Sequence, residues 1–109
     1  NLNMNYTLHA DQPMFESNPF SLIYTAVTRR TKEGFKLGAE EAITVEQALK
    51  SLTVMSAWQI GFEDKLGSIK AGKYADLVIL DRNPLEVPVD KIREIRVLQT
   101  IVNGNSVSF

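Results

Sequence analysis

The sequence is poor in the residue types that most often carry enzyme chemistry. None of its 109 residues is cysteine, which excludes disulfides, thiolate zinc sites and cysteine nucleophiles. His9 is the single histidine, so chemistry that needs two imidazoles cannot occur within this chain alone. The absence of cysteine is typical of a reducing compartment, and we expect a cytoplasmic protein.

Long apolar runs and a strong charge imbalance are also missing. No apolar run approaches the roughly 20 residues of a membrane-spanning helix, so we expect no membrane partner. Twelve basic and thirteen acidic residues give a net charge of -1, which disfavours a polybasic surface for nucleic acid. Apolar residues make up 44% and charged residues 23%, as in a globular chain with one ordinary domain at most.

Turn and cap residues organise the beginning of the chain. Tyr6 to Ala10 is rich in strand-forming residues and breaks at Asp11-Gln12-Pro13, which predicts a short strand followed by a loop. Asn18 is a good N-cap, and Pro19 suits the first helical position because its missing N–H costs nothing there. We therefore predict a helix from Pro19 to about Thr31, stopped by Gly34.

A capping box predicts the start of a second helix. Thr44 and Gln47 have the spacing at which the two side chains and backbone N–H groups satisfy one another. Gly61 suits the left-handed residue that ends a helix, so this helix should run to about Ile60. Apolar residues spaced by three and four mark its expected buried face: Val45, Ala48, Leu49, Leu52 and Met55.

The second half of the chain favours strands. Leu77 to Leu80 is apolar at every position, which predicts a strand covered on both faces. Asp90 to Ile95 is expected to form one short helical turn. Asn103-Gly104, between Val97 to Val102 and Ser106 to Phe109, predicts a β-hairpin.

His9 and Asp11 are the only pair that could hold a metal or move a proton. They lie two apart at the end of a predicted strand, where both could share one face. Imidazole nitrogen and carboxylate oxygen both suit a divalent transition metal. The alternative is a turn in which the aspartate caps backbone N–H groups, and the spacing alone favours this turn.

The remaining charged motifs have structural interpretations. Asp76 and Asp81 flank one strand, roughly 16 Å apart at about 3.3 Å per residue, so we expect each to cap a turn. After Gly67 to Lys73 comes Tyr74 rather than the Ser or Thr of a phosphate loop, and a predicted strand rather than a helix, which favours tight turns. Arg29, Arg30 and Lys32 lie at the C-terminal end of the first predicted helix, where the helix dipole favours positive charge. Met55 and Trp58, near the end of the second, are expected to pack.

Several of these motifs together resemble a known family. Gly67 to Asp81, which reads GSIKAGKYADLVILD, closely resembles the C-terminal signature of the amidohydrolase superfamily. Ile43 to Leu49 resembles the helix before that signature, and Val97 to Gly104 resembles the family's closing hairpin. Three further segments resemble the last barrel strand and its helix in the branch called amidohydrolase family 3: His9 to Pro13, Asn18-Pro19 and Ala26 to Arg29.

The resemblance implies a fold, a metal and a role for one residue. It implies an α/β fragment, with the last βα unit of a (β/α)8 barrel in residues 1–61 and part of a small β-sandwich in residues 62–109. Asp11 matches the family's metal-binding aspartate, which also shuttles protons for a metal-activated water. The implied reaction is hydrolysis of non-peptide C–N bonds in a small-molecule substrate, with a divalent metal, zinc by expectation. The resemblance assigns no role to His9, because some members of the family have serine at the matching position.

The family's other ligands have no match in this chain. Its His-x-His, its bridging carboxylate or lysine and its two further histidines would lie upstream of Asn1, so we expect a C-terminal fragment. The isolated chain should be inactive and bind no metal tightly, because one carboxylate and one imidazole hold a catalytic metal poorly. The alternative is a non-catalytic structural module whose exposed sheet edges associate, giving a homo-oligomer.

Overall fold

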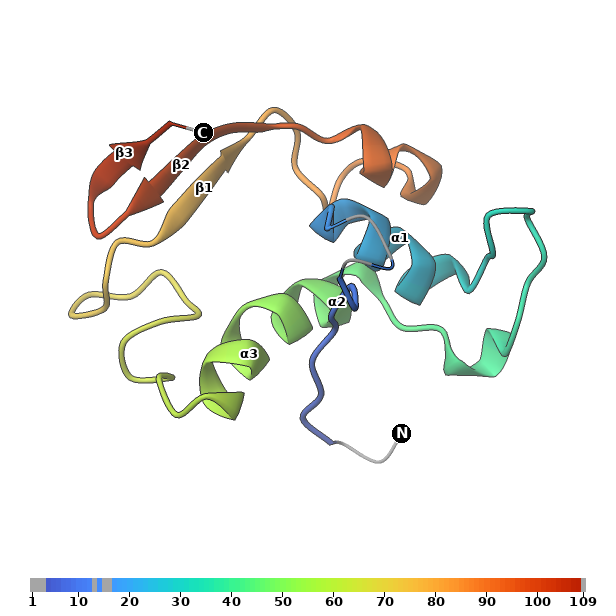
Figure 1. The fold of residues 1–109 in the computed structure, drawn as a ribbon, viewed down its shortest axis with the longest axis horizontal. Coiled ribbons are helices and arrows are strands. Elements are labelled where there is room, and N and C mark those ends of the chain that lie inside the picture. The colour runs from blue at the N-terminus through green and yellow to red at the C-terminus, as the bar shows by residue number, and fades with distance from the viewer. Residues whose placement is uncertain (1–3, 13, 15–16, 109) are drawn as a thin grey trace.

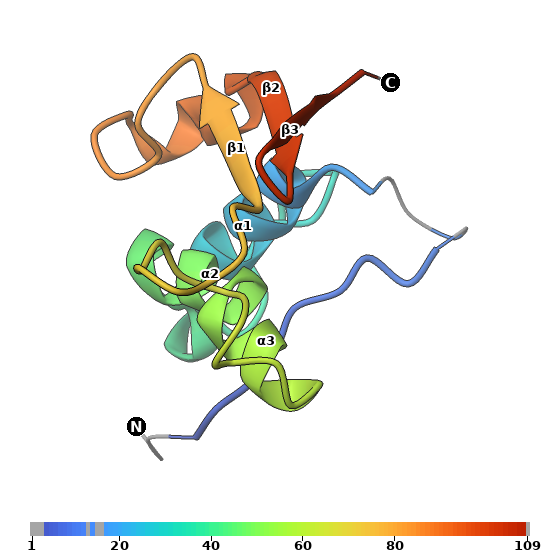
Figure 2. The ribbon, with the colours of Figure 1, turned by 90° about the vertical axis from the view of Figure 1, so that its left-hand side faces the viewer.

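The computed structural model describes residues 4–12, 14 and 17–108 of a small α/β structure (Figure 1). The one described sheet lies at one side of the molecule, apart from the α-helices (Figures 1 and 2). The elements follow in the order α1 (Pro19–Thr28), η1 (Ala39–Glu41), α2 (Val45–Leu52), α3 (Val54–Gln59), β1 (Leu77–Leu80), η2 (Val89–Glu94), β2 (Val97–Val102) and β3 (Asn105–Val107).

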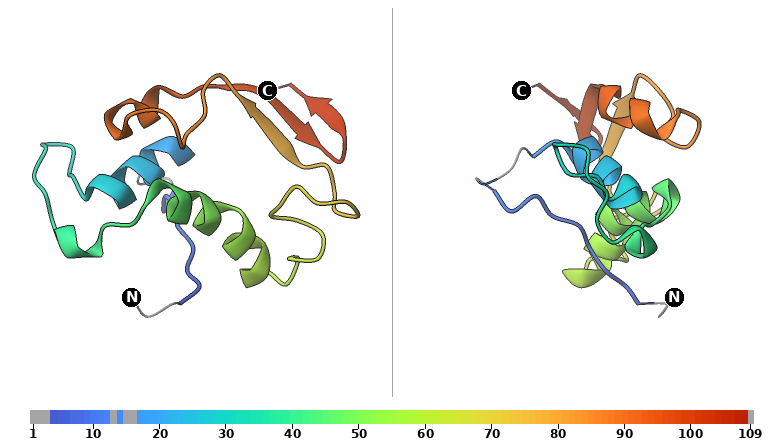
Figure 3. Two further views of the ribbon diagram at one scale, coloured as in Figure 1. Left: turned by 180° about the vertical axis from the view of Figure 1, so that it is seen from behind. Right: turned by 90° about the vertical axis from the view of Figure 1, so that its right-hand side faces the viewer.

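The N-terminal segment is not a strand. Tyr6 to Ala10 has no strand partner within the described residues, so the predicted strand does not form a β-ladder. A strand needs a neighbour to pair its backbone groups, and the sheet lies far from this segment (Figure 3). The segment is tied to α3 instead, because Thr7 Oγ1 donates a 2.8 Å hydrogen bond to Gln59 Oε1.

α1 begins as predicted and ends earlier. Asn18 Oδ1 accepts a 2.9 Å hydrogen bond from the Phe20 N–H, and Pro19 is the first helical residue. The helix stops at Thr28 rather than Thr31, because Arg29 adopts a left-handed backbone with φ 55°. The chain then turns back on itself, and Gly34, expected to stop the helix, lies in this turn at φ 89°.

The second predicted helix is divided into α2 and α3. Its capping box is present: the Thr44 N–H donates to Gln47 Oε1 at 2.9 Å, and the Gln47 N–H donates to Thr44 Oγ1 at 3.1 Å. The helix breaks at Thr53, where φ is -123° and ψ is -90°. Ser56 Oγ donates to the Ser51 carbonyl at 2.8 Å, and such side-chain bonds compete with the helical ladder. Gly61 then follows α3 at φ 73°, as predicted.

The sheet is antiparallel with β2 in the centre. β1 pairs with β2, and β2 pairs with β3, through the predicted hairpin at Asn103-Gly104. Both turn residues have positive φ, 49° and 81°, which the twist of a two-residue hairpin requires. The described part of β3 runs from Asn105 to Val107, and Phe109 lies outside the described residues.

The expected burial of β1 is wrong for this chain. Val78 is 57% exposed and Ile79 is 44% exposed. On the face that carries Val78, the neighbouring Leu98 is 62% exposed. An apolar strand is buried only when a second layer covers each face, and none of the described elements packs over this sheet. The run of apolar residues therefore indicates a strand suited to burial, but the described residues supply no layer that buries it.

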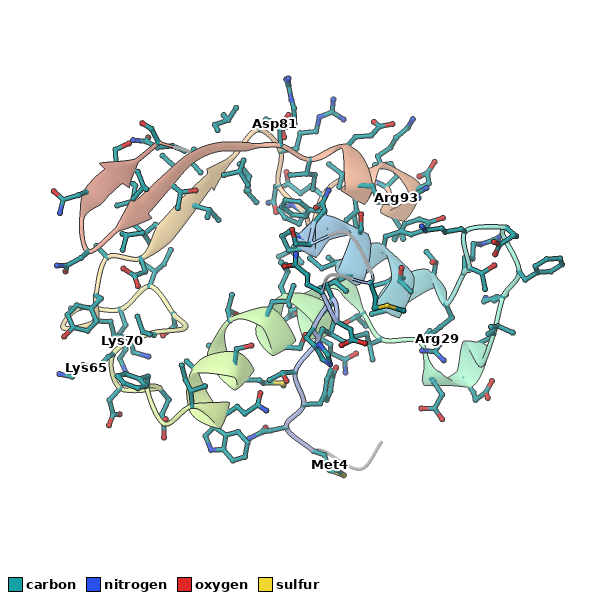
Figure 4. All side chains as sticks on the ribbon, in the orientation of Figure 1. Met4, Arg29, Lys65, Lys70, Asp81 and Arg93 are labelled. Carbon is teal, nitrogen blue, oxygen red and sulfur yellow. The ribbon has the colours of Figure 1, made fainter. Side chains whose placement is uncertain are left out.

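The core lies between α1, α2 and η2. Its buried residues are Phe20, Ile23, Ala48, Ile92 and Ile95. The predicted turn near residues 90–95 is a 3₁₀ helix, η2, which inserts Ile92 into this core. The Arg93 guanidinium lies 4.0 Å from the centre of the Tyr24 ring, a cation–π contact that adds to the attachment of η2 on α1 (Figure 4).

Gly67 marks the place where the loop before β1 touches the α2–α3 break. A Cβ at Gly67 would lie 2.8 Å from the Ala57 Cβ and 3.0 Å from the Thr53 carbonyl oxygen, and φ is +91°. Gly67→Ala should lower the free energy of unfolding by about 2–4 kcal/mol, from the left-handed backbone and from overpacking. Urea denaturation measures this loss.

Gly72 provides the matched control for that substitution. Its φ is also +91°, but a Cβ there would meet nothing within 4 Å. Gly72→Ala should therefore cost only the backbone term, about 1–2 kcal/mol. Equal losses for the two variants would contradict the close contact at Gly67.

Candidate functional site

Asp11 lies at the end of the extended N-terminal segment, in an unusual backbone conformation. Its φ is 53°, in the left-handed region that residues other than glycine rarely enter. Its N–H donates a 3.1 Å hydrogen bond to His9 Nδ1, and its carbonyl accepts a 3.1 Å hydrogen bond from the Met14 N–H. The structure thus brings His9 and Asp11 together, but through the backbone of Asp11 rather than its side chain.

The carboxylate of Asp11 suits a metal ligand. Asp11 is exposed, and within the described residues its side chain accepts no hydrogen bond. Carboxylate oxygen is a common ligand of zinc and other divalent ions. The described part of the chain contains no cluster of three side chains able to hold a metal. The Asp11 carboxylate therefore has the chemistry of one ligand, and the described residues do not supply the rest.

His9 fits a metal less well. Because Nδ1 accepts the Asp11 N–H, the neutral ring must carry its hydrogen on Nε2, which makes Nε2 a donor. A nitrogen that bears hydrogen offers no lone pair to a metal. The pair thus offers one exposed carboxylate and one imidazole that binds backbone.

Two hollows on the described surface lie away from this pair. One, of about 340 Å³, is lined by Tyr6, Leu8, Ala26, Arg29, Glu41 and Ile43. The other, of about 110 Å³, lies between the N-terminal segment and α3, beside Trp58 and Gln59. Tyr6 lines both, and its buried hydroxyl has no hydrogen-bond partner among the described residues. Trp58, expected to pack, is 53% exposed.

The other two aspartates bind backbone, as expected for turn caps. Asp76 Oδ1 accepts a 2.8 Å hydrogen bond from the Asn103 N–H, across the sheet from its own strand. Asp81 accepts one at 2.9 Å from the Arg96 N–H. That N–H, with the Arg96 guanidinium, holds the pKa of the Asp81 carboxyl below its ordinary value. Both carboxylates therefore stabilise the fold.

The basic residues do not gather into one patch. Arg29 donates from Nε to the Leu37 carbonyl and lies beside η1, on the opposite side of the molecule from Lys65 and Lys70 (Figure 4). Lys73 donates to the carbonyls of Glu63 and Leu66, so this lysine holds a turn, as the expected turns in that stretch require. None of the helices in the described part has the length and apolar character of a membrane crossing.

Comparisons with known proteins agree with the sequence motifs. A model of the amidohydrolase family matches residues 1–108. An N-substituted formamide deformylase from Arthrobacter pascens is 39% identical over 98 residues, which cover 90% of this chain and 18% of that protein. A 5-methylthioadenosine/S-adenosylhomocysteine deaminase from Teredinibacter turnerae is 40% identical over 50 residues, 46% of this chain and 11% of that protein.

A solved structure extends the likeness to three dimensions. An amidohydrolase from Thermotoga maritima MSB8 superposes with a TM-score of 0.71 and 26% identity, covering 96% of this chain and 23% of that chain. The chain spans less than a fifth of the length of the two curated relatives above. The match to the family model includes both the segment around Asp11 and the sheet. The chain belongs to the amidohydrolase family.

Proposed function

We propose that this chain is the C-terminal part of a metal-dependent amidohydrolase that hydrolyses non-peptide C–N bonds. The observation that carries the proposal is the family match over residues 1–108. The names of the relatives support the bond type: a formamide deformylase and a deaminase both act on carbon–nitrogen bonds. The substrate is then a small molecule that contains such a bond.

Asp11 is the residue of this chain to which we assign chemistry. When bound, a divalent metal supplies a water whose pKa is lowered toward 7. The Asp11 carboxylate would contribute one ligand and accept the proton of that water. Asp11 would hold that proton and return it to the leaving nitrogen as the C–N bond is hydrolysed. The exposed carboxylate, with no hydrogen bond in the described part of the chain, supports this role.

The same proposal assigns the two parts of the fold. Residues 1–61 would be the last βα unit of a (β/α)8 barrel, with the extended N-terminal segment as its strand and α1 as its helix. Residues 62–109 would be part of a small β-sandwich. Among the described residues, the N-terminal segment has no strand partner and the sheet has no covering layer. This supports the division, because the longer protein would supply both.

The test uses a protein in which this chain is joined to the residues encoded before Asn1. We expect it to release amine or ammonia from at least one member of a panel of N-substituted formamides and aminopurine nucleosides. The activity should disappear on dialysis against a chelator and return with zinc. The 109-residue chain alone should be inactive. Activity that survives metal removal would contradict the proposal, as would stoichiometric nanomolar zinc binding by the isolated chain in calorimetry.

A second candidate function is favoured by the sheet. Val78, Leu98 and Val102 are 48–62% exposed on one face, and β1 and β3 are edge strands. Unpaired edges and apolar faces pair readily with a second chain. We propose that the isolated chain is a non-catalytic module that associates with a second copy through this sheet. Sedimentation velocity at micromolar concentration should then show a dimer that Leu98→Lys dissociates, whereas a folded monomer would contradict it.

A further inference from the structure

The backbone of Asp11 has an unfavourable left-handed conformation, and hydrogen bonds hold both its N–H and its carbonyl. A left-handed residue other than glycine costs of order 1–3 kcal/mol and persists only where its surroundings impose it. Here the Asp11 N–H is bound by His9 and its carbonyl by the Met14 N–H. Strain of this kind gathers at functional sites, where it aims a side chain. The Asp11 side chain is exposed and is the one to which we assign chemistry.

We infer that His9 is a positioning residue for Asp11, and this inference rests on the proposed function. His9 Nδ1 accepts the Asp11 N–H at 3.1 Å and so holds the peptide group that carries the Asp11 Cα. Together with the φ of 53°, this bond sets the direction in which the carboxylate leaves the backbone. The imidazole acts on the metal only through Asp11. Groups that orient a metal ligand from behind typically change metal affinity or activity by about 10- to 100-fold when removed.

The geometry makes a specific substitution informative. In His9 the acceptor Nδ1 is three bonds from Cα, through Cβ and Cγ. In asparagine Oδ1 is also three bonds from Cα, and asparagine commonly accepts the N–H two residues on in a turn. Glutamine places its acceptor one bond farther out, and alanine has none. His9→Asn should therefore keep the support of Asp11, and His9→Gln and His9→Ala should remove it.

The first measurement uses the 109-residue chain and needs no metal. With uniform ¹⁵N labelling at pH 8, where an ordinary imidazole is neutral, a scalar coupling should connect the Asp11 amide nitrogen with His9 Nδ1 through the hydrogen bond. In His9→Asn the Asp11 amide proton should keep its shift within a few tenths of a ppm. In His9→Ala it should move to the value of an unbonded amide. A His9 ring without this coupling, in a chain whose other signals are intact, overturns the inference.

The second measurement uses the longer protein described above. His9→Ala and His9→Gln should weaken zinc affinity and lower kcat by about 10- to 100-fold, while His9→Asn should stay within about threefold of the parent protein. Circular dichroism checks that each variant is folded. Zinc affinity and kcat unchanged in His9→Ala would overturn the inference, as would equal losses in His9→Ala and His9→Asn.

Failure of the inference can be separated from failure of the proposed function. If Asp11→Asn abolishes activity and His9→Ala does not change it, Asp11 has its proposed role and His9 does not position it. If Asp11→Asn leaves both metal content and activity intact, the proposed function of Asp11 fails. In that case the coupling between His9 and Asp11 describes a turn alone, and the inference fails with it.

Discussion

Asp11→Asn should lower kcat of the longer amidohydrolase by about 10²- to 10⁴-fold, the range that a positioned acid–base group contributes. Asparagine has nearly the same shape and tolerates the left-handed backbone seen at φ 53°. It lacks the negative charge that a divalent ion favours, and its amide cannot accept the proton of the attacking water. The loss should therefore fall on kcat and metal content, with little change in folding.

Asp76→Asn is the matched control for this prediction. This substitution also replaces a carboxylate by an amide. Among the described residues, Asp76 Oδ1 accepts the Asn103 N–H, and asparagine keeps an oxygen that can accept the same bond. The control should retain kcat within about twofold. Initial rates over a range of substrate concentrations, with zinc measured by mass spectrometry, separate the two variants. A kcat for Asp11→Asn equal to that of the control would refute the assignment.

Ile92→Ala should have the largest effect on stability, a loss of about 2–5 kcal/mol in the free energy of unfolding. Ile92 has no exposed surface and belongs to the buried cluster that also contains Phe20 and Ile23 from α1 and Ala48 from α2. Removing three carbons leaves a cavity that these neighbours fill only in part. Because total stability is only about 5–15 kcal/mol, the urea midpoint should fall steeply.

Two further variants establish that the loss is caused by the cavity. Ile92→Val removes one carbon and should cost about 0.5–1.5 kcal/mol. Ile69→Ala changes an isoleucine that is 89% exposed and should be close to neutral. A graded order, with Ile92→Ala largest and Ile69→Ala smallest, is the expected result. A loss at Ile92 as small as that at Ile69 would contradict the described core.

The parts of the fold that could be predicted are those encoded by near neighbours. Asn18 with Pro19, Thr44 with Gln47, and the Asn103-Gly104 turn each depend on bonds within a few residues, and the structure confirms all three. The end of α1 was missed because Arg29 is left-handed without being glycine. The break at Thr53 depends on hydroxyl groups that bind carbonyls of the preceding turn.

The parts that could not be predicted depend on distant partners. A strand at Tyr6 to Ala10 requires a neighbouring strand, and burial of β1 requires a covering layer, so neither can be decided by local pattern. At the candidate site, the spacing of His9 and Asp11 allowed both to share one face but favoured a turn, and the metal role of Asp11 came from the family resemblance. The bond from the Asp11 N–H to His9 and the positive φ at Asp11 are two separate features of the local turn. The only sequence signal for the left-handed backbone at residue 11 is that aspartate enters this region more readily than most residues.

The attachment of the sheet through η2 has a consequence for how this chain opens. η2 is anchored in the core by Ile92, whereas β3 contacts only its neighbour β2 in the ladder. β3 can therefore separate from β2 while α1, α2 and η2 stay assembled, so this edge of the sheet opens as a unit distinct from the core. Amide hydrogens of the Thr100–Val107 pairing should exchange with solvent long before those of α1. The core of α1, α2 and η2 would thus open slowly, whereas the β3 edge of the sheet would open often and independently of the core.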